Sequence, residues 1–99
     1  MSRPFIVRPE AEQDLADAFA WYEGQAAGLG DEFLRSVDAA FALIQRHAAA
    51  YPVIYQDVRR GLVRRFPYGV FYVADVERTV VLAVSHMSQD PRTWPRSGP

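Results

Sequence analysis

The chain lacks cysteine and lysine altogether, and it contains no long apolar run. Without cysteine it forms neither disulfides nor thiolate metal sites, which suits a reducing compartment. A membrane-spanning helix needs about 18 consecutive apolar residues, and a secretion signal needs a shorter apolar core. Near the start, the strand-like Phe5-Ile6-Val7 is followed at once by charged residues. We therefore expect a cytoplasmic protein with no membrane association.

The formal net charge is only −1, but the two halves of the chain carry opposite signs. Residues 1–50 hold four arginines against eight acidic residues, and residues 51–99 hold seven arginines against four. Such a dipolar chain suits a protein partner or a local anion site better than broad adhesion to nucleic acid. Direct binding to nucleic acid is accordingly disfavoured.

A length of 99 residues, 49% of them hydrophobic, predicts one domain over 1–99. A short strand at 5–7 leads through Pro9 into an amphipathic helix that should reach about Ala27. Gly28-Leu29-Gly30 breaks the helical pattern, and Asp31 is a plausible N-cap for a second helix that ends near residue 50. Two helices joined by so short a turn must lie antiparallel, and each has an apolar stripe to bury.

The second half of the chain reads as an extended connection over 51–61 followed by three strands at 62–66, 68–74 and 79–86. The short turns between them predict antiparallel neighbours. The fold class is therefore α+β in the order β-α-α-β-β-β, with a helical hairpin packed on an antiparallel sheet. The last strand is apolar on both faces, which predicts an interior position in the sheet. The core should bring seven helix residues against Val70, Tyr72 and Val81: Leu15, Phe19, Tyr22, Phe33, Val37, Phe41 and Ile44.

Several side chains stand out as candidates for binding a partner. Trp21 lies off the apolar stripe of the first helix, and an exposed tryptophan is a frequent anchor in protein interfaces. Alternation along a strand at 62–66 would place Arg64 with the apolar side chains and leave Arg65 exposed. The full set of candidates is Trp21, Arg59, Arg60, Arg64, Arg65, Arg92 and Trp94.

The sequence contains none of the spacings that hold metals or phosphates. His47 and His86 fall at the ends of separate elements, without an HExxH motif. The one Gly-rich segment, 28–30, joins two helices instead of following a strand. We therefore expect no cofactor and no metal.

An ordered set of motifs resembles the RelE/ParE superfamily of bacterial toxins over nearly the whole chain. The motifs are Ala11…Asp14-Leu15, Trp21-Tyr22-Glu23, Gly28-Leu29-Gly30 with Phe33 and Val37, Phe66-Pro67-Tyr68-Gly69-Val70-Phe71-Tyr72, Val81-Leu82-Ala83-Val84 with His86, and Asp90-Pro91…Trp94. The resemblance implies a toxin of a type II toxin-antitoxin module and a cognate antitoxin with which it forms a hetero-oligomer. It also implies one of two targets, ribosome-bound mRNA or DNA gyrase.

The two targets differ in the residues that they require. The resemblance to the ribonuclease branch implies an arginine near the start of the strand after the middle turn, and a histidine or tyrosine at the end of the last strand. Here the first position reads Tyr68-Gly69-Val70, and Met87 follows His86, so that only His86 and Arg64 or Arg65 match. A lone imidazole at a strand end is more often structural than catalytic.

We therefore favour a ParE-like inhibitor of DNA gyrase, which is not an enzyme. One alternative is a RelE-like ribosome-dependent mRNA endonuclease that uses His86 and Arg65. Another is a non-toxic binding module of the same fold, because fold alone does not fix function.

Overall fold

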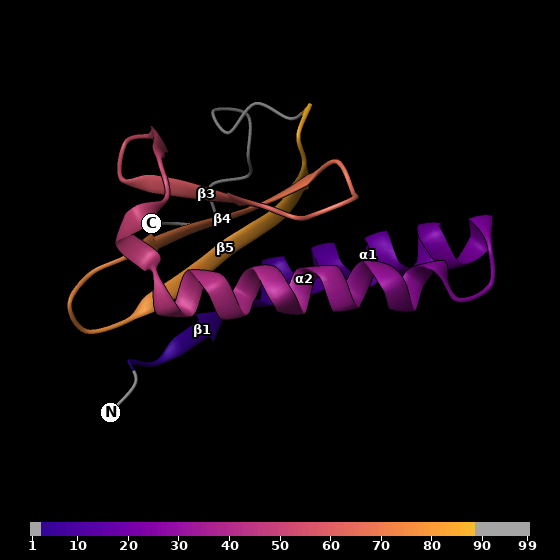
Figure 1. Cartoon of the computed structure of the whole chain (residues 1–99), viewed down its shortest axis with the longest axis horizontal. Coiled ribbons are helices and arrows are strands. Elements are labelled where there is room, and N and C mark those ends of the chain that lie inside the picture. Colours follow the sequence, from indigo (N-terminus) through magenta and orange to yellow (C-terminus); the bar gives the residue numbers. More distant parts are fainter. Residues whose placement is uncertain (1–2, 89–99) are drawn as a thin grey trace.

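Two helices pack on one face of a five-stranded sheet (Figure 1). The computed structural model of the chain describes residues 3–88. Its elements are β1 (Phe5–Val7), α1 (Pro9–Gln25), α2 (Leu29–Arg46), the 3-10 turn η1 (Ala48–Ala50), β2 (Val53–Tyr55), β3 (Val58–Leu62), β4 (Tyr68–Ala74) and β5 (Thr79–His86). The strand order across the sheet is β1-β5-β4-β3-β2. The α+β class and the helical hairpin on a sheet are confirmed.

The sheet is mixed, whereas the sequence predicted an antiparallel one. β1 runs parallel to β5, with Phe5 opposite Thr79 and Val7 opposite Val81, and the other pairings are antiparallel. After β1, the chain forms the helical hairpin on one face of the sheet. The later strands complete the sheet, and β5 lies beside β1. β5 has a neighbour on each side, as its apolar character on both faces predicted.

The predicted strand at 62–66 is wrong. β3 ends at Leu62, and the segment predicted as a connection forms the hairpin of β2 and β3. Residues 63–67 form a turn in which Arg65 adopts a left-handed φ of 73°, closed by a hydrogen bond from Val63 N–H to the Tyr68 carbonyl (2.9 Å). Apolar side chains of this turn reach the core although they do not lie in a strand. The ring centroids of Phe66 and Tyr22, for example, are 4.9 Å apart.

Both helix boundaries at the hairpin differ from the expected ones. α1 ends at Gln25, and α2 begins at Leu29 with Gly28 as its N-cap at a left-handed φ of 87°, so that Asp31 lies inside the first turn. The Glu23 side chain closes the hairpin, since its two carboxylate oxygens accept N–H groups of Gly28 (2.9 Å) and Gly30 (3.0 Å). The Glu23 carboxylate of α1 thus accepts N–H groups at the start of α2, the role that the sequence predicted for Asp31.

Most of the predicted core is confirmed. Tyr22, Phe33, Val37 and Ile44 are buried with Val70, Tyr72 and Val81 between the helices and the sheet. Three residues of the predicted core are only partly buried: Leu15, Phe19 and Phe41. Three alanines of the helices are buried in the core as well: Ala11, Ala18 and Ala40. No helix among residues 3–88 is long and apolar enough to cross a membrane.

Candidate functional site

Two grooves of different chemistry flank the helical hairpin. The first, which we call the α1 groove, has a volume of about 600 Å³ and lies between α1 and the ends of β4 and β5. Its lining residues are Asp14, Asp17, Ala18, Trp21, Tyr22, Pro67, Tyr68, Val84, Ser85 and His86. The second, the α2 groove, has a volume of about 470 Å³ and is lined by Glu32, Arg35, Ser36, Ala39, Ala40, Leu43, Leu62, Arg64 and Arg65.

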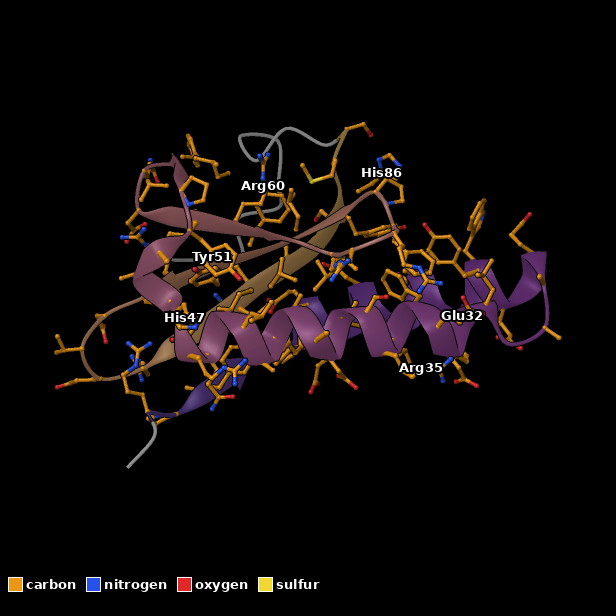
Figure 2. All side chains as sticks on the ribbon, viewed as in Figure 1. Glu32, Arg35, His47, Tyr51, Arg60 and His86 are labelled. Atoms are coloured by element: carbon orange, nitrogen blue, oxygen red, sulfur yellow. The ribbon has the colours of Figure 1, made fainter. Side chains whose placement is uncertain are left out.

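His86 is exposed at the end of β5, where it lines the α1 groove (Figure 2). Its Nδ1 lies 2.9 Å from the Ser88 hydroxyl and accepts the Ser88 N–H at 3.2 Å. The ring also meets Tyr68 edge-on, with centroids 5.5 Å apart. The imidazole thus has a hydrogen-bonding neighbour and an aromatic neighbour, and its role stays a prediction.

The charged neighbours of His86 in the α1 groove are carboxylates. Asp14 accepts the backbone N–H of Val84 at 2.9 Å, and Asp17 accepts the side-chain amide of Gln13 at 2.8 Å. Burial raises the pKa of Asp14; the Val84 hydrogen bond opposes this, and the negative charges of Asp17 and Glu10 add to it. Of the described residues that line this groove, none is an arginine.

Trp21 stands on the rim of the α1 groove, 60% exposed. Its ring packs edge-on against the buried Tyr22, with centroids 5.1 Å apart. An exposed, oriented indole of this kind can serve as an anchor for a partner.

The predicted arginines within residues 3–88 are not gathered into one patch. Arg64 and Arg65 are exposed in the turn after β3 and line the α2 groove, where Arg65 lies 3.5 Å from Glu32. The prediction that alternation along a strand separates these two arginines is wrong, because neither lies in a strand. Arg65 is exposed as expected, and so is Arg64.

Arg59 and Arg60 lie in β3 on opposite faces of the sheet. The Arg59 guanidinium donates hydrogen bonds to the carbonyls of Ala49 and Tyr51, so it ties the segment after α2 to the sheet. Arg60 pairs with Phe71 and points away from the helices (Figure 2), and its buried Nε has no hydrogen-bond partner among residues 3–88. Their predicted role in partner binding stays a prediction. Arg92 and Trp94 lie outside the described residues.

Several residues that line the two grooves are not among the candidates predicted from the sequence. Asp14 and Asp17 precede Trp21 by seven and four residues, a spacing that places all three on one side of a helix. This spacing alone does not distinguish the lining of a groove from an acidic face of a helix exposed to solvent. Leu43 and Leu62, which are 41% and 59% exposed, line the α2 groove from separate elements, and no local pattern connects them.

Comparison with known proteins agrees with this architecture. The family model described as ParE toxin of type II toxin-antitoxin system, parDE, matches residues 5–91. A solved structure described as the chromosomal ParDE TA system from P. aeruginosa is similar to this chain with a TM-score of 0.73. The two are 16% identical, and the match covers 86% of this chain and 96% of that chain, so this likeness concerns the fold. No curated protein matches the chain significantly. Because the family model spans most of the chain, the protein belongs to the ParE toxin family of type II toxin-antitoxin systems.

Proposed function

We propose that this protein inhibits DNA gyrase by binding it, and that a cognate antitoxin neutralises it. Membership of the ParE family supports a toxin with an antitoxin partner. The choice of gyrase over mRNA rests on the chemistry around His86.

The observation that carries this choice is the composition of the α1 groove. Cleavage through a ribose 2′-hydroxyl needs a base, an acid and cations that stabilise the charge developing on the phosphate. Around His86, residues 3–88 contribute Asp14 and Asp17 to the groove and no arginine. Two carboxylates repel a phosphate backbone, so the groove is unsuited to RNA. An inhibitor that works by binding needs no such catalytic set.

The direct test adds purified protein to gyrase with supercoiled plasmid and, in parallel, to translating ribosomes. We expect stabilised double-strand breaks in the plasmid and intact mRNA. His86→Gln should change the gyrase effect by no more than about threefold, because no proton transfer is lost, whereas an endoribonuclease that uses His86 should lose about 10²–10⁴ in cleavage rate. Cleaved mRNA with unaffected gyrase would overturn the proposal.

The α2 groove is the surface that best fits the antitoxin. It combines the exposed Leu43 and Leu62 with three arginines, Arg35, Arg64 and Arg65. β2 pairs with only the first residues of β3, which leaves the rest of β3 without a strand neighbour on that side within residues 3–88. An extended or helical segment with apolar and acidic side chains would satisfy this combination.

Salt dependence tests this part of the proposal. Association with the antitoxin encoded beside the gene should slow as ionic strength rises, because the arginines attract an acidic segment from a distance. Arg64→Gln combined with Arg65→Gln should weaken the salt dependence, while Arg78→Gln, in the exposed turn before β5, should leave it unchanged. A stable, toxic protein that binds nothing encoded beside it would contradict the antitoxin assignment.

A further inference from the structure

The α1 groove carries negative charge that the described part of the protein leaves without a cationic partner. Asp14 and Asp17 face it from adjacent turns of α1, and each accepts a neutral N–H group. Neither has a basic side chain within ion-pair distance among residues 3–88. Burial raises the pKa of Asp14, and the nearby charges of Asp17 and Glu10 raise it further, against the Val84 hydrogen bond. A cation that entered this groove would relieve that repulsion.

The same groove presents an aromatic surface suited to a cation. Trp21 is 60% exposed, and its contact with Tyr22 at an interplanar angle of 85° orients the indole at the rim. The face of a tryptophan ring attracts a guanidinium or ammonium group, and a planar guanidinium also stacks on it. Trp21 and Asp17 are four residues apart on α1, so one ligand side chain can reach both.

Beside these residues, α1 and not a strand borders β5. β1 pairs with β5 only as far as Val81, and beyond that point the α1 side of β5 has no strand neighbour among the described residues. Asp14 accepts the one N–H that this edge offers at Val84. Val84 and Ser85 are buried beside α1, so a ligand side chain enters the groove from its rim, where Asp17, Trp21 and His86 are exposed.

We propose that the α1 groove receives an arginine side chain of the toxin's target protein, stacked on Trp21 and bonded to the carboxylates of Asp17 and Asp14. This inference rests on the proposed function, in that the target is a protein and not RNA. Arginine suits the groove better than lysine because its planar, forked donors can contact a ring face and two carboxylates at once. Within residues 3–88, no three His, Cys, Asp or Glu side chains are placed to hold a metal ion, which argues against a metal as the occupant.

The two grooves then have separate tasks. The α2 groove, with three arginines, favours an acidic segment of the antitoxin, and the α1 groove favours a basic segment of the target. Opposite charge keeps each partner out of the other's groove.

A peptide titration tests the groove directly. The full-length, nitrogen-15-labelled protein is titrated with the end-blocked peptide Gly-Gly-Arg-Gly-Gly and with the same peptide carrying uncharged citrulline in place of arginine. We expect the arginine peptide to shift the Trp21 indole and Val84 amide signals in the NMR spectrum, and the citrulline peptide to bind about fivefold more weakly. Asp17→Asn and Trp21→Ala should each weaken binding about three- to fivefold.

Glu12→Gln is the matched control, since it removes an exposed carboxylate of α1 that does not line the groove. Its affinity for the arginine peptide should equal that of the unchanged protein. Equal binding of the two peptides, or an equal loss in Glu12→Gln and Asp17→Asn, would overturn the inference. The amide spectrum of each variant shows at the same time whether the fold is intact.

The same variants separate this inference from the proposed function. If the unchanged protein inhibits gyrase, Asp17→Asn and Trp21→Ala should lose about three- to fivefold in potency while Glu12→Gln retains it. Full potency in all three variants would overturn the inference and leave gyrase inhibition standing. Failure of the unchanged protein to inhibit gyrase would overturn the proposed function, and the peptide titration alone would then decide the chemistry of the groove.

Discussion

Several polar side chains bind backbone groups of another segment of the chain. Asp14 holds α1 to β5, Glu23 closes the helical hairpin, and Arg59 and Tyr72 attach the segment after α2 to the sheet. The buried Tyr72 hydroxyl donates to the Ala48 carbonyl at 2.7 Å. Such bonds satisfy backbone groups that the ends of helices and strands leave without partners.

Tyr72 should make the protein sensitive to alkali. Burial raises the pKa of its hydroxyl from 10.0 to about 12, against the opposing effect of Arg59. The unfolded chain therefore loses this proton at lower pH than the folded protein does. The stability that depends on the protonated hydroxyl is complete below about pH 10 and is lost as the pH rises towards 12, by at most about 1.4 kcal/mol per pH unit.

Tyr72→Phe provides the comparison, because Tyr22 and Tyr68 also have raised pKa values. Below pH 9 the variant should be about 1–3 kcal/mol less stable than the unchanged protein, since the Ala48 carbonyl loses its donor. Between pH 10 and 12 the difference should shrink. Urea unfolding at each pH measures it, and a constant difference across this range would contradict the assignment.

At the scale of elements, the hairpin of α1 and α2 depends on the Glu23 carboxylate. Glu23→Ala should cost about 1–2 kcal/mol, the usual loss when a helix start is deprived of its side-chain acceptor. Gln25→Ala, at the exposed end of α1, should change the stability by less than about 0.5 kcal/mol. The two values come from urea unfolding, and equal effects would show that the carboxylate does not close the hairpin.

The aromatic cluster between the helices and the sheet centres on Phe33. Its ring centroid lies 5.2 Å from that of Tyr22, 5.3 Å from that of Phe66 and 5.1 Å from that of Tyr68, and its side chain is fully buried. Phe33→Ala should therefore cost about 3–5 kcal/mol.

Phe41, which is partly buried and contacts Phe5, serves as the comparison on the same helix. Phe41→Ala should cost clearly less than Phe33→Ala in denaturant unfolding. A larger loss for Phe41 would mean that the core is centred nearer the other end of α2.

The helices and the last two strands could be predicted because their apolar residues repeat at helical spacing or form continuous runs. The end of β3 could not be predicted in this way. Val63 and Phe66 look like strand residues because they are apolar, but they enter the core from a turn. β2 is only three residues long, and the adjacent Arg59 and Arg60 hide the alternation of β3. Trp21 was found because it departs from the stripe of α1, whereas the α2 groove depends on tertiary contacts between α2 and the turn after β3.

At the scale of the whole molecule, the uneven charge of the sequence reappears as two grooves on opposite sides of the hairpin. The acidic half of the chain supplies Asp14 and Asp17 to the α1 groove, and the basic half supplies Arg64 and Arg65 to the α2 groove. If the two partners bind separate surfaces, the antitoxin does not need a binding segment that resembles that of the target. Neutralisation would then require the bound antitoxin to block the target by its bulk.

The measurement that tests the central claim most directly is a time course in cells after expression of the protein alone. Gyrase inhibition predicts that growth stops and that the DNA-damage response rises before protein synthesis falls. It also predicts the same order of events in the His86→Gln variant, since binding needs no proton transfer. Arrest of translation with cleaved mRNA before any DNA damage, abolished by His86→Gln, would contradict the account.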